Sequence, residues 1–468
     1  MRIWLFVLIS LVSFWRGAFA QAQTDRTSPV AFVHATVIDG TGAAARPNQT
    51  VLVSGDRITA VGPSGKVVIP PGAHTIEATG RFLIPGLWDA HVHTRYEGID
   101  HFRLLVANGI TSARNMSAPW EYLPKVLALR EQIAKGDRIG PRLLTTGPVL
   151  NGPGAVRPPN VAVNNADEAA QAVRRVKSEG ADFAKVYNLL SRESYFAIAA
   201  EAKAQGLPFV GHVPFAIKAD EASDAGQLSI EHADAIVRAS STQAEEIRRQ
   251  LQDRVRASVT SIDIAKLRVL AERLRKNGTN VVPTLSAYSN RLEWFSEHST
   301  FAGADRFRYV PAAYVEGWKQ QQLALPLEDV RRLLEQCLIA VRELNKAGVT
   351  ILAGTDVGVA SQVPGFSLHD ELSLLVKAGL SEMEALEAAT RNPARAFNLT
   401  DQGTIETGMR ADLLLLDPNP LENIDNTRKI RTVVTAGRVF ERNELDAMLS
   451  DVQRAASQWT GTPTRGDR

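Results

Sequence analysis

Short apolar segments alternate with amphipathic segments through most of this chain, and this alternation constrains the fold more than any other feature. Eight apolar segments have the length and composition of β-strands, and helical stretches such as 166–179 and 191–205 follow most of them. Strands that alternate with helices are typical of βα units and a parallel sheet. Eight units match a closed (β/α)8 barrel, the TIM barrel of the α/β class. The strand candidates are 86–91, 110–114, 142–146, 183–187, 209–212, 228–232, 281–284 and 351–355.

Both ends of the chain have the pattern of a second, smaller β-structure. Short β-rich pieces separated by turns fill residues 31–83, and similar pieces return at 403–440. Because the termini of a domain often lie close together, we expect the two stretches to pair into one small β-sandwich domain. The strand candidates are 31–38, 50–53, 57–61, 66–69, 74–77, 403–406, 411–416 and 432–440. The predicted organisation is a β-sandwich from 21–84 with 400–445, a barrel from 85–399 and a flexible C-terminal tail from 446–468.

Two connections are longer than a barrel requires. Residues 235–280 follow the sixth strand candidate, and residues 286–346 follow the seventh. The aromatic residues of the second insertion form either a lid over the substrate or an extra helical pair with its own small core, since large apolar side chains usually pack in cores. They are Trp294, Phe295, Phe301, Phe307, Tyr309, Tyr314 and Trp318.

Residues 1–20 predict a secretory signal peptide. Arg2 precedes an apolar stretch from Ile3 to Trp15, and the small-residue triplet 18–20 follows it. An uncleaved anchor is the alternative, but this stretch is shorter than the roughly 18 residues that span a bilayer. We expect cleavage before Gln21, export to the periplasm or the medium, and no stable membrane insertion afterwards. Sequencing the N-terminus of the mature protein tests this, because an intact Met1 would contradict it.

Composition narrows the choice of partners. The chain carries 53 basic and 51 acidic residues, and no basic run or basic-aromatic patch, which argues against nucleic acid as a partner. Cys337 is the only cysteine, so an intramolecular disulfide and a cysteine metal cluster are both excluded. We expect a small-molecule or peptide-like substrate, and assembly into a homo-oligomer stays open.

Two histidines close the first strand candidate. His91 and His93 are two residues apart, and alternate residues of a strand point to the same face, so both imidazoles face the same way. They stand at the carboxyl end of an apolar strand, where barrel enzymes assemble their active sites. The two histidines could therefore clamp one metal ion.

Three further strand candidates end in a residue that can bind a metal. His212 and His232 close the fifth and sixth candidates, and Asp356 follows the eighth. A single buried histidine is often only a hydrogen-bonded core residue, and aspartate is also a favoured helix N-cap. Four histidines and a carboxylate at one end of a barrel instead favour a metal site. Neutral imidazoles with oxygen donors suit zinc and similar divalent ions.

Lys185 stands near the end of the fourth strand candidate. A lysine in such a place is usually one half of an ion pair or extends its ammonium to solvent. The ammonium has no lone pair to offer a metal. A neutral amine, by contrast, can take up carbon dioxide and present a carbamate, whose two oxygens are able to bridge two ions.

The set as a whole resembles the binuclear branch of the amidohydrolase superfamily. The order H-x-H, Lys, His, His and Asp falls at strands one, four, five, six and eight, and the resemblance covers nearly the whole mature chain. Segments 83–93, 211–212, 353–356 and 388–394 carry the match, together with the split β-sandwich. Within the superfamily the chain is most similar to proteins related to imidazolonepropionase and to Xaa-Pro dipeptidases.

The resemblance implies a two-metal hydrolase. Two divalent ions, expected to be zinc, would share a hydroxide that attacks the carbonyl carbon of an amide. Asp356 would accept the proton of that hydroxide and pass it to the leaving amine. By this resemblance one ion would be held by His91, His93 and Asp356 and the other by His212 and His232, with a carbamate on Lys185 bridging the two.

Three residues are candidates for binding the substrate. Tyr187 lies two residues after Lys185, so its hydroxyl could donate to the substrate carbonyl as charge develops there, or its ring could pack at the rim of the barrel. His369 opens a helix after the eighth strand and either reaches the pocket or stays in the first turn. Arg114 could pair with a substrate carboxylate, depending on which face of its strand it occupies. Asn115 departs from many relatives, which have an aspartate there.

The predicted function is hydrolysis of the carbon–nitrogen amide bond of a dipeptide or an N-acyl amino acid. Export favours scavenged peptides or xenobiotic amides as substrates. One alternative keeps both metals but opens a cyclic amide or a lactone. A mononuclear deaminase fits less well, because that branch uses acidic residues in place of the bridging lysine and Lys185 is present. A barrel that has lost catalysis and only binds its ligand is the last alternative.

Overall fold

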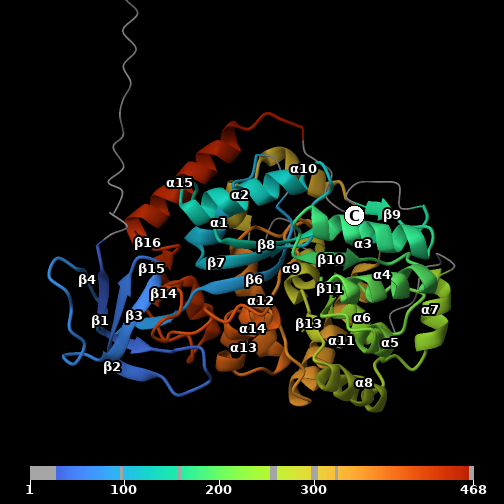
Figure 1. Ribbon diagram of the computed structural model, residues 1–468, viewed down its shortest axis with the longest axis horizontal. Helices are drawn as coiled ribbons and strands as arrows, with labels where there is room; N and C mark the ends of the chain where they lie inside the picture. The colour runs from blue at the N-terminus through green and yellow to red at the C-terminus, as the bar shows by residue number, and fades with distance from the viewer. Residues whose placement is uncertain are drawn as a thin grey trace, which may run out of the picture.

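A computed structural model describes residues 28–94, 98–154, 160–252, 261–296, 304–321 and 325–462. The signal expected at 1–20 and Phe301 of the aromatic insertion lie outside these residues, so both stay predictions. Figure 1 shows a mixed sheet at one end of the molecule and a barrel with its surrounding helices at the other. Within the described ranges, no helix has both the length and the apolar character needed to cross a membrane.

Seven parallel strands form most of the barrel wall, in the order β6-β7-β8-β10-β11-β12-β13. Nearly all their residues are buried, because barrel strands have packed side chains on the inside and helices on the outside. The strands are β6 (Leu87–Val92), β7 (Ile110–Asn115), β8 (Arg142–Asn151), β10 (Phe183–Val186), β11 (Phe209–Gly211), β12 (Ser229–Glu231) and β13 (Asn280–Val282), and β9 (Asn160–Ala162) pairs with the end of β8.

An eighth segment, residues 351–355, closes the barrel between β13 and β6. The Leu352 N–H donates to the Val281 carbonyl (2.9 Å), and the Ala90 N–H donates to the Ala353 carbonyl (2.9 Å). The segment is too irregular to form a regular strand, yet its hydrogen bonds continue the wall on both sides. The predicted (β/α)8 barrel is confirmed.

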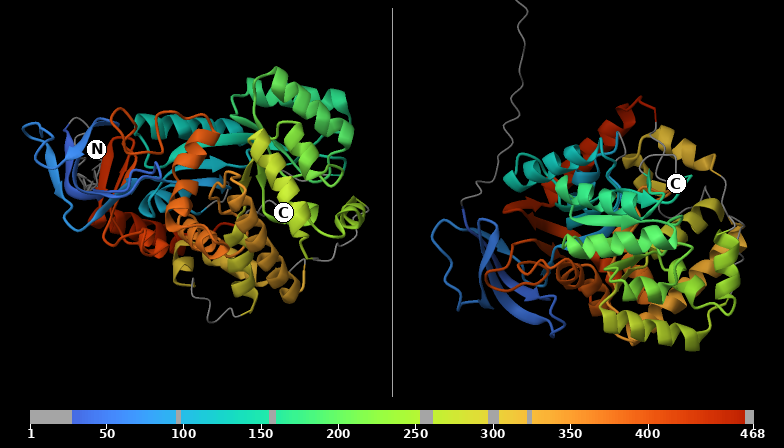
Figure 2. Two further views of the ribbon diagram at one scale, coloured as in Figure 1. Left: turned by 90° about the horizontal axis from the view of Figure 1, so that it is seen from below. Right: turned by 45° about the vertical axis from the view of Figure 1, so that its right-hand side comes forward.

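Helices cover the outside of this barrel, as the views in Figure 2 show. The predicted helices 166–179 and 191–205 are confirmed as α3 (Ala166–Ser178) and α4 (Arg192–Ala204), whose N-caps Asn165 and Ser191 accept hydrogen bonds from the first turn. The others are α1 (His101–Ala107), α2 (Leu123–Lys135), α5 (Ala219–Asp224), α6 (Asp234–Ala239), α11 (Leu327–Lys346), α12 (Phe366–Ala378), α13 (Glu382–Ala388) and α14 (Arg391–Ala396).

The two long insertions add further helices. The aromatic side chains of the second insertion pack against one another, with Trp294 and Phe307 5.2 Å apart between ring centroids. Their cluster also contacts Ala360 and Val363, which belong to the loop after the eighth segment. Of the two alternatives for this insertion, the structure therefore shows the small helical core, which packs on the loop after Asp356. The helices are α7 (Ala244–Gln252) and α8 (Ile264–Asn277), then α9 (Leu285–Ser296), η1 (Ala304–Tyr309) and α10 (Ala312–Lys319).

The second sheet is built from both ends of the chain, as predicted. Its order is β16-β15-β14-β5-β1-β2-β3, with β4 paired to β1, and the antiparallel pair β5–β14 joins the two ends. Phe32 and Val51 share one core with Leu413 and Val434. The strands are β1 (Val30–Val37), β2 (Arg46–Ser54), β3 (Arg57–Pro63), β4 (His74–Glu77), β5 (Phe82–Pro85), β14 (Leu413–Leu416), β15 (Ile430–Thr435) and β16 (Arg438–Glu441).

Two of the predicted strands in this region are wrong. Residues 66–69 form no strand: Lys66 N–H donates to the Pro63 carbonyl in a turn, and Val68 is 85% exposed. Residues 403–406 also lie outside any strand, although Ile405 enters the core of the sheet. In both places apolar residues are present but no neighbouring strand is available to pair with them. The predicted strand 432–440 is two strands, β15 and β16, with a turn between them.

The predicted flexible tail is also wrong for its first part. Residues 442–458 form helix α15 (Arg442–Gln458), which leads away from the sheet and packs on α1 and η1 (Figure 1). Leu445, Met448, Val452 and Ala456 recur at helical spacing and are all buried. This apolar stripe stabilises the helix against the barrel. Residues 463–468 lie outside the described residues, and the short helix η2 (Ile424–Arg428) completes the fold.

Candidate metal centre

Four histidines and one aspartate meet at the carboxyl ends of the barrel strands. The centroid of the His91 ring lies 5.4 Å from that of His93 and 5.0 Å from that of His232. The centroids of the His212 and His232 rings are 4.7 Å apart. Asp356 Oδ1 lies 3.3 Å from His91 Nε2 and 3.1 Å from His93 Nε2. The fold therefore brings together five of the six predicted metal ligands.

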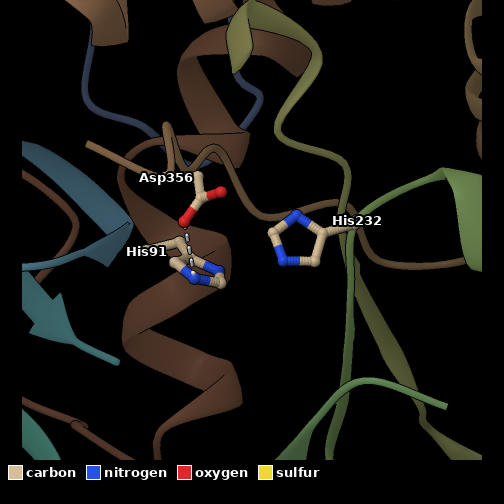
Figure 3. A group of neighbouring side chains, drawn as sticks. All are labelled: His91, His232 and Asp356. Atoms are coloured by element: carbon tan, nitrogen blue, oxygen red, sulfur yellow. Dashed lines mark ion pairs between the residues drawn. The ribbon is translucent and has the colours of Figure 1, made fainter. Parts of the chain in front are cut away.

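Three of these side chains form the most compact group. One ligand atom from each of His91, His232 and Asp356 lies within 4.8 Å of the others. Figure 3 shows the Asp356 carboxylate next to the His91 ring, with the His232 ring facing both from the neighbouring part of the barrel. Such a group of two imidazoles and one carboxylate could hold a divalent ion.

The Nδ1 atom of each histidine has a hydrogen-bond partner, which leaves Nε2 as the atom to offer a metal. Metal-binding histidines usually have their second nitrogen held in this way. His91 Nε2 is buried and has no hydrogen-bond partner among the described residues. The donor set thus fits a divalent metal. The four Nδ1 contacts are His91 to Glu231 (2.9 Å), His93 to Ser117 (3.2 Å), His212 to Asn188 (2.8 Å) and His232 to Thr284 (2.8 Å).

Left-handed backbone conformations occur at the ends of three neighbouring strands. The φ angles are +70° at His232, +51° at Thr284 and +57° at Asp356. Non-glycine residues rarely adopt this conformation, and such strain is concentrated at functional sites. Strict strand alternation would place Glu231 and His232 on opposite faces, yet both contact His91. The turn at His232 redirects its side chain into the mouth of the barrel.

Lys185, the sixth predicted ligand, lies on β10 and is buried. Burial lowers the pKa values of His91 and His212 well below their usual range, and the charge of Lys185 lowers both further. Lys185 is therefore close enough to act on histidines of both halves of the site. Tyr187 lies beside it, with its ring 4.0 Å from the His212 ring and its side chain half-buried.

Two buried carboxyl groups have opposite pKa shifts. Burial raises the pKa of Asp356, but the hydrogen bond with His93 and the nearby histidines outweigh it and hold the pKa well below its usual range. Asp356 is thus ionised, as a metal ligand must be. For Asp89, burial raises the pKa to about 7. Its carboxyl group accepts from Thr355 Oγ1 (2.7 Å) and from the His91 N–H (3.1 Å), which joins β6 to the closing segment.

Arg114 does not face the substrate, so its predicted role in substrate binding is wrong. The side chain is fully buried inside the barrel, where it donates to the Ala90 carbonyl (2.7 Å) and to Glu231 (2.8 Å). Its guanidinium also lies 4.7 Å from the centre of the Phe397 ring. With its donors engaged by the barrel wall, it has no route to a substrate carboxylate.

The predicted substrate contact of His369 is wrong as well. Its ring is buried on α12, with Nδ1 2.9 Å from Thr427 Oγ1 and Nε2 3.1 Å from the Asn108 carbonyl. Both nitrogens are therefore used to join α12 to η2 and to the end of α1. His369 therefore stays in the first turn of α12 and packs against other parts of the protein.

Asn115 uses both ends of its amide. Its oxygen accepts from the Thr94 N–H (3.2 Å), and its nitrogen donates to the Ser117 carbonyl (2.9 Å) and to Thr145 Oγ1 (3.0 Å). An ionised aspartate could not donate these last two bonds. The departure from relatives therefore suits a residue that ties three strand ends together.

Comparison with known proteins identifies the family. The model of the Amidohydrolase family matches residues 82–440. This chain belongs to the amidohydrolase family. It is 29% identical over 393 residues to the imidazolonepropionase of Rubrobacter xylanophilus, which covers 79% of this chain and 84% of that protein.

Solved structures agree with this assignment. A candidate prolidase from Bifidobacterium longum has a TM-score of 0.67 and 26% identity, with 91% of this chain and 99% of the other covered. A bottromycin amidohydrolase has a TM-score of 0.72 and 24% identity, with 92% and 91% covered, and shows that the fold is shared. As a member of its family, this amidohydrolase is a hydrolase of carbon–nitrogen bonds, and the family generally uses a divalent metal centre.

A large cavity lies among helices α5, α6, α7 and α8, and none of the six predicted metal ligands is part of its wall. Its volume is about 1130 Å³, and its wall includes Val213, which directly follows His212, and Ala235 and Arg238 on the helix after His232. Apolar side chains of α7 and α8 line much of the rest, among them Ile247, Leu251 and Leu270. The loop after His212 and the helix after His232 thus form one side of this apolar cavity.

Several residues of the site were not predicted from the sequence. Glu231, Asn188, Thr284 and Ser117 hold the histidines, and Asp89 holds the backbone at His91. Asp89 could have been found, because it lies two residues before His91 and so shares its face of the strand. Asn188, Thr284 and Ser117 follow strand ends, where the chain leaves regular alternation and sequence spacing no longer gives direction, and Glu231 is the last residue of β12.

Proposed function

We propose that this amidohydrolase uses two divalent metal ions to hydrolyse the amide bond of a dipeptide or an N-acyl amino acid. The observation that carries the proposal is the shared arrangement of the four histidines. Each has its Nδ1 held by a neighbouring side chain at the mouth of the barrel, beside an ionised Asp356. Buried polar atoms normally have a hydrogen-bond partner. Nε2 of the buried His91 has none within the described part of the chain, which favours a metal-binding role over a purely structural one.

The ligands divide into two groups in this proposal. His91 and His93 would hold one ion together with Asp356, which contacts both rings. His212 and His232 would hold the other, and Lys185, whose charge acts on both His91 and His212, would join the two groups as a carbamate. When bound, two such ions, which we expect to be zinc, make water more acidic and polarise a carbonyl group.

The chain's own residues then handle protons and orientation. Asp356 accepts a proton at its carboxylate and passes it to the leaving amine of the substrate. Tyr187 donates its hydroxyl hydrogen to the substrate carbonyl oxygen, where negative charge develops. Its place beside Lys185 and His212 supports this role.

The apolar cavity supports substrates with a hydrophobic group. The cavity wall includes Val213, which directly follows His212, so we propose that the cavity takes an N-acyl chain or an apolar side chain of the substrate, which would contact Ile247 and Leu270. Burying such a group contributes about 25 cal/mol for each Å² of apolar surface. We therefore expect kcat/KM to rise with the size of the apolar group in a series of N-acyl amino acids.

A hydrolysis screen tests the proposal. The protein is prepared with zinc and bicarbonate and incubated with hydrophobic-Xaa-Pro dipeptides, N-acyl-prolines and other N-acyl amino acids. Asp356→Asn, which keeps the size of the side chain, is the matched control and should lose nearly all activity. If fully metal-loaded protein cleaves none of the panel, the proposed substrate class is wrong.

A second candidate is opening of a cyclic amide or lactone at the same centre. The similarity to the imidazolonepropionase of Rubrobacter xylanophilus, an enzyme named for a ring compound, favours its inclusion. Lactams, lactones and imidazolones therefore form the second half of the screen. Hydrolysis of rings with no cleavage of linear amides would select this alternative.

A further inference from the structure

We infer that the buried pair Arg114–Glu231 is a positioning device for His91. In this account the pair fixes the proton of His91 on Nδ1, orients the ring and so keeps Nε2 ready to bind metal. Neither residue contacts the substrate or the metal. The inference rests on the proposed metal centre and adds to it two residues that determine how tightly the centre binds its ion.

Glu231 is the residue that contacts His91. Its carboxylate is fully buried on β12, and Oε2 lies 2.9 Å from His91 Nδ1. Ser229 donates to Oε1 (2.5 Å), so the carboxylate is held on both sides. An ionised carboxylate has lone pairs and no hydrogen to donate. His91 must therefore carry its proton on Nδ1, and its Nε2 must be the unprotonated atom.

Arg114 holds this carboxylate from across the barrel. It lies on β7, which does not neighbour β12 in the sheet. Its Nη2 donates to both oxygens of Glu231 (2.8 and 3.0 Å), and its Nη1 donates to Ser229 Oγ (3.0 Å). The guanidinium packs against the rings of Phe397 and Phe183. The charge of Glu231 is thus balanced inside the barrel, and its position is fixed by two strands.

Among the contacts that the described residues make, His91 is the one histidine of the four whose Nδ1 lies against a carboxylate. The other three contact Ser117, Asn188 and Thr284, which are neutral. The hydroxyls of Ser117 and Thr284 can donate or accept, so they do not by themselves fix the ring proton, whereas the Asn188 amide oxygen can only accept. A carboxylate partner also makes the ring a stronger metal ligand, because it stabilises the proton that remains on Nδ1. His91 is therefore held by a charged acceptor, where the other described Nδ1 contacts are neutral.

Zinc affinity of Glu231→Gln tests the inference. The glutamine has nearly the same shape, but its amide can present either a donor or an acceptor to Nδ1. Losing such an outer partner typically weakens metal affinity 10- to 100-fold. We expect a loss of this size, measured with metal-free protein by competition against a chelator. Ser117→Ala, which removes the neutral partner of His93, is the matched control and should weaken affinity less.

A spectroscopic measurement covers the case in which the variant fails to fold. In metal-free wild-type protein labelled with ¹⁵N-histidine, the His91 signals should show a proton on Nδ1. They can be assigned by their absence in His91→Gln. A proton on Nε2 of His91, or a Glu231→Gln protein that is folded and binds zinc as tightly as wild type, would overturn the inference.

The two proposals fail in different ways. If wild-type protein binds no zinc, the proposed function fails, while the position of the His91 proton still reports on the pair. If zinc binds with high affinity and Glu231→Gln leaves that affinity unchanged, only the positioning role fails.

Discussion

Tyr187 is the residue whose role can be separated most cleanly from metal binding. Its ring lies 4.0 Å from the ring of His212, but it is not among the proposed ligands. Removal of a hydrogen-bond donor that acts on developing charge costs about 100- to 1000-fold in kcat. We expect Tyr187→Phe to lower kcat within this range and to leave the metal content unchanged, as measured by steady-state kinetics and elemental analysis.

A second tyrosine provides the control for this variant. Tyr195 is buried, and its hydroxyl donates to the side chain of Gln227 (2.7 Å) rather than lying against a histidine ring. Tyr195→Phe removes the same atom from the protein and should change stability while leaving kcat nearly unchanged. Equal kcat in Tyr187→Phe and wild type would contradict a role for Tyr187 in catalysis.

At the residue scale the sequence predicts the ligands but not their supports. Alternation places His91 and His93 on one face, and the family resemblance supplied the remaining ligands. The supports were hidden because they depend on contacts between distant strands. Arg114 and Glu231 are 117 residues apart and meet inside the barrel. No local pattern distinguishes such an arginine from one that binds a substrate, which is why its predicted role was wrong.

Helix α12 carries a pH-dependent contribution to stability through His369. Burial, together with the charge of Arg428, lowers the pKa of this histidine from 6.5 to about 3. A ring with a lower pKa in the folded state resists protonation, so its contribution is complete above pH 6.5 and is lost as the pH falls toward 3. We expect wild type to lose about 2 kcal/mol more stability than His369→Gln between pH 7 and pH 5.

Urea unfolding at several pH values measures this difference. His34→Gln is the matched control, because the His34 side chain is about half exposed in the sheet, 49% by area. Parallel pH profiles for wild type and His369→Gln would show that the buried ring does not resist protonation.

Helix α15 should stabilise the barrel even though it follows the sheet in sequence. Leu445 is fully buried, and the helix packs on α1 and η1. Replacing a buried leucine by alanine costs about 2 to 5 kcal/mol, from lost burial and the cavity left behind. We expect Leu445→Ala to lose stability in this range in urea unfolding. Arg454→Ala, on the exposed side of the same helix, should change it by less than about 0.5 kcal/mol, and equal losses would contradict this packing.

At the element scale, the strength of the periodic signal determined which predictions succeeded. Strands buried on both faces read as apolar runs and were found with small errors at their ends. The closing segment 351–355 was also found, but its irregular hydrogen bonding was not foreseen. Gly354 explains part of it, since a Cβ there would lie 2.9 Å from the His91 nitrogen. The predictions for residues 66–69 and for the region of helix α15 were wrong, because the structure of such segments depends on the strands and helices they contact.

The molecule as a whole places its chemistry at one end of a barrel. The sheet from both chain ends packs beside it, and Arg142 at the start of β8 pairs with Asp412 of the sheet region (2.8 Å). The proposed metal ligands stand at the opposite, carboxyl ends of the strands, where loops can vary without loss of the fold. The apolar cavity is lined by the loop after His212 and by α6, α7 and α8. Substrate choice and metal binding therefore depend on loops that the barrel holds in place.

The metal content of the purified protein tests the central claim most directly. Wild type prepared with zinc and bicarbonate should contain close to two equivalents of divalent metal per chain by elemental analysis. Lys185→Ala, which lacks the proposed bridge, should contain clearly less and lose most of its activity. Wild-type protein with no tightly bound metal after this preparation would contradict a binuclear hydrolase at this site.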